Sequence, residues 1–366
     1  SAPATPSAAD VERLVQALRQ ARRPVFVAGR GSRSPEAAAA VVRLADACGA
    51  LLATSAVAKG LFHGQPWNLD VSGGFATPTA ADLIRGADLI VGWGCALNMW
   101  TMRHGTLIGP GAVVVQVDDT AEALGAQREL TFGVLGDVAA TAQLAGEVLG
   151  SAAAGASGYR TDDVADRLAH RGRWQDEPYR DTSGDGVIDP RTLTLRLDEL
   201  LPDERVVAVD SGNFMGYPSM FLSVPDEHGF CFTQAFQSIG LGLATAIGAA
   251  LARPDRLPVA ALGDGGCLMS VAELDTVVRL GIPMVAIVYN DDAYGAEVHH
   301  FGPDGFALDT VRFPPTDIAA IARGHGFTAV TVRQESDLAP VLEWLAGDRR
   351  TPLLVDAKVT RDEPSW

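Results

Sequence analysis

The sequence lacks paired cysteines, long apolar runs and an excess of positive charge. Its cysteines, Cys48, Cys95, Cys231 and Cys267, form no Cys-x-x-Cys pair, which excludes a disulfide frame or zinc site and indicates reduced thiols. No apolar run approaches the ~18 residues of a membrane span, and no signal pattern opens the sequence, so we expect a cytoplasmic protein with no membrane partner. A net charge of −16, from 29 basic and 45 acidic residues, argues against nucleic acid as a partner.

What the sequence does contain is a regular alternation of buried strands and amphipathic helices. Its 366 residues, 47% of them apolar, are enough for two domains of ~150 residues each. The alternation predicts an α/β fold of two parallel-sheet, three-layer domains. We expect a Rossmann-like domain over 1–155, a linker over 156–188 and a second domain over 189–366.

The first domain offers only a weak nucleotide signal. We expect its first helix to have Asp10 as N-cap, and the Gly- and Pro-rich segment 58–79 to be a loop. Its first strand ends in a turn, Gly29-Arg30-Gly31-Ser32, which lacks the third glycine of the dinucleotide fingerprint. A plain strand-to-helix turn is therefore favoured over a nucleotide site. In the linker, Asp185 and Asp189 leave a calcium loop open as an alternative, but the other ligand positions are absent and a solvated connection is favoured.

The second domain is organised around two strand ends that carry carboxylates. One strand ends in Gly263-Asp264-Gly265-Gly266, and the next ends in Asn290, Asp291 and Asp292. Asp264 and Asp291 are 27 positions apart, a spacing that places both at the carboxyl ends of neighbouring parallel strands, where open α/β sheets bind ligands. Two carboxylates there repel each other unless a cation lies between them. Mg²⁺ bound to a phosphate ester suits this arrangement, because Mg²⁺ takes few protein ligands and shares substrate phosphates.

This stretch resembles the diphosphate-binding motif of thiamine diphosphate (ThDP) enzymes, which runs Gly-Asp-Gly, a spacer and then Asn-Asn. The alternative, that Gly-Asp-Gly is only a turn, is disfavoured because spacing, context and end residues all agree. One departure is that Asp291 stands where the family has its second Asn, which adds a negative charge and alters the metal preference. The resemblance implies that the metal is held by Asp264, Asp291 and the carbonyl of Ala293, and the diphosphate by Gly263, Gly265 and Gly266.

Two further segments resemble cofactor-contacting parts of the same family. The strand end Asp210-Ser211-Gly212-Asn213 resembles a segment that reaches the diphosphate, with Asn213 at a contacting position, although a turn cap remains an alternative. In the run from Phe236 to Gly242, Ile239 matches the apolar residue that props the cofactor in its bent form. The resemblance implies that the backbones of Gln237 and Ile239 hold the aminopyrimidine.

Glu297 and His300 are the candidates for proton transfer and for the substrate pocket. Glu297 lies six positions after Asp291, where pyruvate and indolepyruvate decarboxylases have a catalytic Glu and acetolactate synthases have an apolar residue. A buried carboxyl beside the cofactor would shuttle protons, whereas a solvent-facing helix Glu would not. His300 follows three positions later and is expected on the same helix face.

The resemblance covers the central and diphosphate-binding domains of the three that such enzymes usually have. The missing pyrimidine-binding domain normally carries the Glu that activates the cofactor, so we expect a separate subunit or a longer precursor to supply it, in a homo- or hetero-oligomer. The implied reaction is ThDP- and Mg²⁺-dependent decarboxylation of a 2-oxo acid, with acetolactate-synthase-like carboligation and a non-catalytic scaffold as alternatives. Some relatives bind FAD in the central domain, but no residue of this sequence can be assigned to it.

Overall fold

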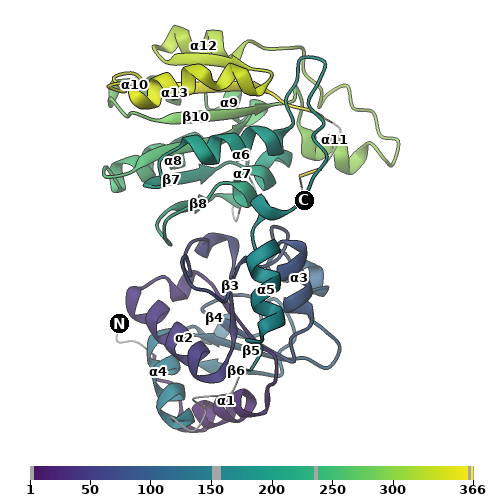
Figure 1. Ribbon diagram of the computed structural model, residues 1–366, viewed down its shortest axis with the longest axis vertical. Coiled ribbons are helices and arrows are strands. Elements are labelled where there is room, and N and C mark those ends of the chain that lie inside the picture. Colours follow the sequence, from purple (N-terminus) through teal and green to yellow (C-terminus); the bar gives the residue numbers. More distant parts are fainter. Residues whose placement is uncertain (1–3, 151–157, 235–237, 362–363, 366) are drawn as a thin grey trace. The chain divides into compact units, whose positions relative to one another are not determined.

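The computed structural model describes residues 4–150, 158–234, 238–361 and 364–365. Two compact units divide between Glu177 and Pro178, within the segment expected to be a linker, and each is a parallel sheet with helices on both faces (Figure 1). No helix in the described ranges combines the length and apolar character needed to cross a lipid bilayer. All four cysteines are free thiols, with Cys231 half-buried and the other three buried.

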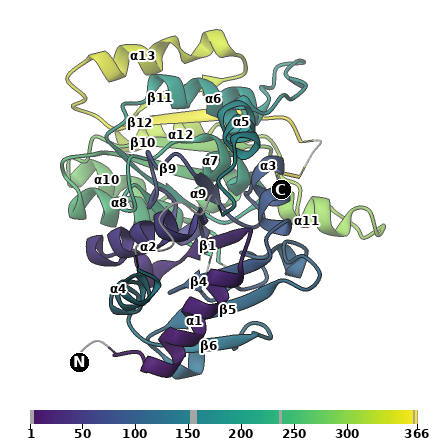
Figure 2. The same cartoon turned by 60° about the horizontal axis from the view of Figure 1, so that its bottom comes forward.

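The first unit holds a six-stranded sheet in the order β3-β2-β1-β4-β5-β6, all parallel; in Figure 2 the labels β1, β4, β5 and β6 follow one another in this order. Its strands are β1 (Pro24–Ala28), β2 (Leu51–Thr54), β3 (Asn68–Val71), β4 (Leu89–Trp93), β5 (Val113–Asp118) and β6 (Phe132–Leu135). Its helices are α1 (Ala8–Gln20), α2 (Pro35–Cys48), α3 (Pro78–Arg85), α4 (Val138–Leu149) and α5 (Asp162–Arg171).

Side-chain alternation along β1 explains the three layers of this unit. Phe26 and Ala28 point to one face, where they pack with apolar residues of α1, α2 and α4. Val25 and Val27 point to the other face and pack with residues of α3 and α5. Because successive side chains of a strand face opposite sides, a fully apolar strand must be covered on both.

The second unit holds a six-stranded parallel sheet in the order β11-β12-β10-β9-β7-β8. Its strands are β7 (Arg205–Val209), β8 (Phe230–Phe232), β9 (Leu257–Gly263), β10 (Val285–Asn290), β11 (Thr328–Val332) and β12 (Leu353–Lys358). Its helices are α6 (Pro190–Leu200), α7 (Gly216–Phe221), α8 (Gly242–Ala252), α9 (Asp264–Met269), α10 (Glu273–Arg279), α11 (Gly295–Phe301), α12 (Ile318–His325) and α13 (Ala339–Ala346). One face of the sheet packs with α8, α10 and α12, and the α/β prediction is confirmed for both units.

Several local predictions were wrong. Helix α1 begins at Ala8 with Ser7 as its N-cap, because the Ser7 hydroxyl accepts a hydrogen bond from the Asp10 N–H, and Asp10 lies inside the helix. The expected loop 58–79 contains β3, a short edge strand. Strands β6 and β8 and helix α7 were not anticipated, since they are too short for a periodic pattern to mark them.

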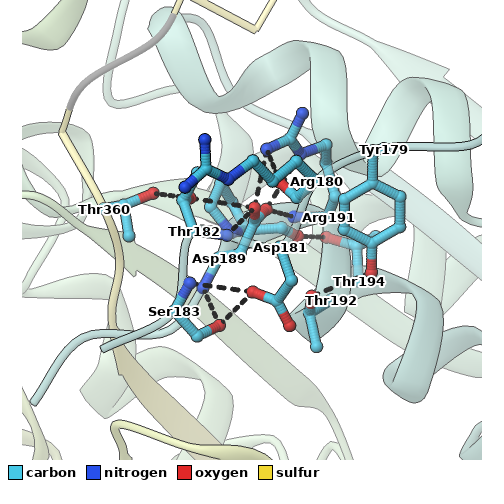
Figure 3. Close-up of polar contacts among 11 residues, drawn as sticks. Tyr179, Arg180, Asp181, Thr182, Ser183, Asp189, Arg191, Thr192, Thr194 and Thr360 are labelled. Atoms are coloured by element: carbon cyan, nitrogen blue, oxygen red, sulfur yellow. Dashed lines mark hydrogen bonds and ion pairs between the residues drawn. The ribbon is translucent and has the colours of Figure 1, made fainter.

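Asp189 fastens the start of the second unit to the end of its sheet (Figure 3). Its carboxylate accepts hydrogen bonds from the N–H and hydroxyl of Thr182 and from the backbone and guanidinium of Arg191. The Thr182 hydroxyl lies 3.3 Å from that of Thr360, which follows β12. The carboxylate is thus engaged in capping α6, which agrees with a structural connection and not with a calcium loop.

Candidate functional site

The order of strands in the second unit has a switch point between β7 and β9, and the sheet edge at this point is called the crevice. The chain leaves β7 towards β8 on one side and leaves β9 towards β10 on the other, so the loops that follow these strands diverge. Such a switch point, at the carboxyl ends of parallel strands, is where open α/β sheets bind ligands. The loops that meet there begin at Asp210 and at Gly263.

Asp264 is the first residue of α9 and is only 4% exposed. Its Oδ1 accepts a hydrogen bond from the Gly265 N–H at 2.7 Å, and its Oδ2 accepts one from the Ala293 N–H at 3.1 Å. Because Gly263 pairs with Tyr289 in the β9–β10 register, the two strands end at the same level. The carboxylate of Asp264 therefore ties the loop after β9 to the loop after β10.

The two acidic residues predicted to hold a metal both have raised pKa values, chiefly because they are buried. Burial and the nearby charge of Asp291 raise the pKa of Asp264 to about 7. Burial likewise raises the pKa of Asp291 to about 6, although the guanidinium of Arg361 opposes this. A divalent cation between them would stabilise both ionised forms, since an opposite charge lowers a carboxyl pKa.

Asn213 lies beside this pair. It begins the short turn Asn213–Met215 after β7, and a Cβ placed on Gly295 would come 3.1 Å from the Asn213 Cβ and 2.6 Å from Oδ2 of Asp291. Three loops, after β7, β9 and β10, thus converge on one place. The structure thus brings together Asn213, Asp264, Asp291 and Ala293, four of the residues that the resemblance assigned to the cofactor and metal.

The glycines after β9 are closely covered by side chains that the sequence did not single out. A Cβ on Gly265 would come 2.4 Å from Cε1 of Tyr294, and one on Gly263 would come 3.0 Å from Cδ1 of Phe214. Tyr294 in turn packs edge-on against Phe313, with ring centroids 4.6 Å apart. The glycines allow the backbone of this turn to be approached closely, which a side chain would prevent.

Of the two residues expected to contact the aminopyrimidine, one falls within the described chain. Ile239 is half-buried and precedes Gly240, whose φ of +85° favours glycine. Gly240 lies against α9, because a Cβ there would come 3.1 Å from the Cβ of Met269 and 3.7 Å from the Gly266 carbonyl. Gln237 lies outside the described residues.

Glu297 and His300 are both on α11, next to the site, and both are exposed. The His300 ring packs edge-on against Phe301, with centroids 4.7 Å apart. The described residues therefore leave Glu297 without the burial that a proton shuttle needs.

The last described residues of the chain reach the site, which no local pattern indicated. The backbone N–H of Ser365 donates to Oδ1 of Asn213 at 3.2 Å, and the Gly216 N–H donates to the Ser365 hydroxyl at 3.2 Å. Arg361 forms an ion pair with Asp292.

Comparison with known proteins gives two matching domains of one family, one domain for each unit. Residues 11–144 match the thiamine pyrophosphate enzyme central domain, and residues 210–357 match the thiamine pyrophosphate enzyme C-terminal TPP binding domain. The chain belongs to the thiamine pyrophosphate enzyme family.

Curated relatives within this family are similar along most of the chain. A sulfoacetaldehyde acetyltransferase of Alcaligenes xylosoxydans xylosoxydans is 27% identical over 92% of this chain and 60% of its own length. An acetolactate synthase large subunit of Parasynechococcus marenigrum is 25% identical over 99% of this chain and 58% of its own length. The chain thus spans about three fifths of the length of these relatives.

The residues at this thiamine pyrophosphate family site suit a metal–diphosphate ligand. No group of three or more His, Cys, Asp and Glu side chains among the described residues is arranged to hold a metal ion. Mg²⁺ does not require one, since it is commonly bound through one or two carboxylates together with phosphate oxygens and water. The raised pKa values of Asp264 and Asp291, two carboxylates on neighbouring loops, fit such a ligand.

The central-domain turn has a packing explanation. A Cβ on Gly29 would come 2.3 Å from the Gly94 carbonyl, and one on Gly31 would come 2.9 Å from the Gly94 Cα. These glycines let two backbone segments, after β1 and β4, touch each other. The strand-to-helix turn favoured from the sequence accounts for them without a nucleotide.

Proposed function

We propose that this chain binds thiamine diphosphate and Mg²⁺ at the crevice of its second unit and is part of a 2-oxo acid decarboxylase or carboligase. The observation that carries the proposal is the pair of carboxylates, buried Asp264 and half-buried Asp291, beside the glycine turn of α9. Two carboxyl groups with raised pKa values on neighbouring strand ends destabilise the folded chain when they are ionised. Such groups are typical of functional sites, which supports a ligand at this place.

Each part of the ligand has candidate contacts in this proposal. The carboxylates of Asp264 and Asp291 and the carbonyl of Ala293 would hold the metal. Asn213 and the turn Gly263–Gly266 would hold the diphosphate, while Ile239, with Gln237, would support the pyrimidine. When bound, the cofactor supplies the carbon nucleophile and the electron sink that decarboxylation of a 2-oxo acid requires.

Glu297 is our candidate for proton transfer to and from the substrate, and His300 for the wall of the substrate pocket. Both are exposed, so we infer that another part of the protein or a partner subunit, carrying the pyrimidine-binding domain, encloses them. We expect the working enzyme to be a cytoplasmic homo- or hetero-oligomer.

The first test is binding of thiamine diphosphate to the chain by calorimetry, with Mg²⁺ and with EDTA. We expect binding that depends on Mg²⁺, and no binding under either condition would overturn the proposal. The second test is CO₂ release from a panel of 2-oxo acids, by the chain alone and with the polypeptide encoded immediately upstream or in a longer reading frame. Activity only in the completed protein is expected, and Glu297→Gln should slow it while leaving cofactor affinity unchanged.

Acetolactate-synthase-like carboligation is the second candidate, supported by the match to an acetolactate synthase large subunit along 99% of this chain. A condensed product formed from two 2-oxo acids, detected beside CO₂, would favour it over simple decarboxylation. A non-catalytic scaffold would bind the cofactor yet release no CO₂ and form no condensed product in the completed protein.

A further inference from the structure

Asp210 is a buried carboxylate at the site that no step above uses. It follows β7 directly and is 1% exposed. Its backbone N–H donates to the Ala261 carbonyl at 2.9 Å, which extends the pairing of β7 with β9 by one residue. Asp210 therefore stands at the same sheet edge as Asp264, at the floor of the crevice.

The Asp210 carboxylate is held by backbone N–H groups from two segments. Its Oδ1 accepts from the Ser211 N–H, and its Oδ2 accepts from the Gly240 N–H, both at 2.8 Å. The N–H groups of Leu241 and Gly242 also favour its ionised form. Leu241, the N-cap of α8, makes no side-chain capping bond. The Asp210 carboxylate, which follows β7, takes the place of a capping side chain for the N–H groups at the start of that helix.

Asp210 also touches the glycine turn of α9. A Cβ on Gly266 would come 2.4 Å from the Asp210 Oδ2 and 3.3 Å from the Gly240 nitrogen. A Cβ on Gly242 would come 2.5 Å from the Cβ of Asp210. One carboxylate thus sits between the turn that carries Ile239 and the turn proposed to hold the diphosphate, and glycine lets both turns close on it.

We propose that Asp210 is a positioning residue that fixes the separation between Ile239 and the Gly265–Gly266 turn. This inference rests on the proposed function, because those two elements are the proposed contacts of the two ends of the cofactor. Thiamine diphosphate would contact both elements, so its affinity depends on their separation. Pyrophosphate would contact only the Gly265–Gly266 turn, so its affinity does not. Asp210 therefore favours thiamine diphosphate over free pyrophosphate.

A carboxylate suits this place because the groups that the described residues bond to it, from Ser211 and from Gly240 to Gly242, are backbone N–H donors. An amide in its place keeps one acceptor oxygen and turns an NH₂ group towards an N–H, so at least one of the bonds to Ser211 or Gly240 is lost. Burial raises the pKa of Asp210, while these N–H groups act in the opposite direction. Loss of a hydrogen bond to a charged group costs about 1.5–3 kcal/mol, or roughly 10- to 100-fold in an equilibrium constant.

The test compares two ligands in the full chain with Mg²⁺. Calorimetry gives Kd for thiamine diphosphate and for inorganic pyrophosphate, in the unsubstituted chain, in Asp210→Asn and in a control, Asp198→Asn. Asp198 is half-buried and also accepts a backbone N–H, that of Ser223 at 2.7 Å, but it pairs with Arg205 at the opposite end of β7. We expect Asp210→Asn to weaken thiamine diphosphate ~10-fold or more and pyrophosphate ~3-fold or less.

The ratio of the Kd for thiamine diphosphate to the Kd for pyrophosphate distinguishes a positioning role of Asp210 from a general effect on the stability of the fold. A purely structural role predicts equal weakening of both ligands, as expected for Asp198→Asn, and an unchanged ratio in Asp210→Asn would overturn the inference. If Asp210→Asn does not fold, Asp210→Glu keeps the charge but moves it by one methylene, and the same ratio must rise. Absence of thiamine diphosphate binding in the unsubstituted chain would overturn the proposed function, and this inference with it; binding with an unchanged ratio overturns this inference alone.

Discussion

Arg361 Nη2 lies 2.5 Å from Oδ2 of Asp292, and this ion pair joins the last described residues to the loop that carries Asp291 and Ala293. Asp292 has a φ of +51°, a conformation that Asp and Asn tolerate better than most residues. Together with the bonds of Ser365 to Asn213 and Gly216, the ion pair places two residues near the end of the chain, Arg361 and Ser365, beside the site.

Breaking this ion pair should expose the end of the chain to protease. Asp292→Asn keeps the backbone conformation but removes the charge, and a partly exposed ion pair is worth at most ~1 kcal/mol. We expect trypsin to cleave after Arg361 up to ~5-fold faster, measured by mass spectrometry of the native protein. Asp317→Asn, which breaks the exposed Asp317–Arg323 pair, is the control and should leave that rate unchanged. Equal rates in all three proteins would mean that the ion pair does not hold the chain end.

Neutralising Asp291 should stabilise the chain without ligands and weaken its hold on Mg²⁺. Burial and the Asp291 charge both raise the pKa of Asp264, and Asp291→Asn removes the second of these causes, a gain we put at ~1 kcal/mol in the free energy of unfolding in EDTA. It also removes one negative charge from the metal donors, so the Kd of Mg²⁺ measured with thiamine diphosphate should rise about 10-fold. Asp275→Asn on the exposed face of α10 should change neither quantity. A destabilised Asp291→Asn protein would contradict the account of repulsion.

Stability without metal should fall as the pH rises. Asp264 and Asp291 have folded pKa values of about 7 and about 6, against 3.8 ordinarily, so the folded chain retains protons that the unfolded chain has released. Their contribution is present below about pH 4 and is lost as the pH rises through 6 and 7.

Urea unfolding in EDTA at pH 5.5 and at pH 8 measures this effect. A tenfold change in a proton-binding constant between the folded and unfolded chain is worth about 1.4 kcal/mol, so the two groups should contribute a loss of a few kcal/mol across the window. Asp264→Asn should flatten the decline, and saturating Mg²⁺ with thiamine diphosphate should remove it. If the stability of the unsubstituted chain increased with pH and that of Asp264→Asn did not, the pH dependence would have the opposite sign. The raised pKa assigned to Asp264 would then be wrong.

Gly265 and Tyr294 should show strong coupling. Gly265→Ala places a Cβ 2.4 Å from Tyr294 Cε1, and such overpacking costs ~1–3 kcal/mol of unfolding free energy. In a Tyr294→Ala background the methyl group has room, so the same substitution should cost less by more than ~1 kcal/mol in a double-mutant cycle. Gly248→Ala on α8, where a Cβ meets nothing within 4 Å, should be neutral or stabilising in both backgrounds. If the effects of Gly265→Ala and Tyr294→Ala were additive, the Tyr294 ring would have to move away from the new methyl group without cost.

The sequence revealed those parts of the site that lie at the ends of long, strongly apolar strands. The convergence of Asp264 and Asp291 follows from the strand–helix–strand spacing, because parallel neighbours end at one edge. Asp210 was named only as part of a turn, since its bond to Gly240 spans 30 positions and no local pattern encodes it. The contacts of Arg361 and Ser365 could not be predicted for the same reason, since their partners are far away in the sequence. The strands β3, β6 and β8 were missed because they have too few residues to show a periodic pattern.

The position of β9 and β10 within the second sheet has a consequence for hydrogen–deuterium exchange. Each strand is paired on both sides, β9 with β7 and β10, and β10 with β9 and β12, so their amides should exchange only when the whole unit opens. Asp264 and Asp291 thus extend from the slowest-exchanging backbone of the unit. The two carboxylates proposed to hold the metal are therefore fixed in place by the folding of the whole unit.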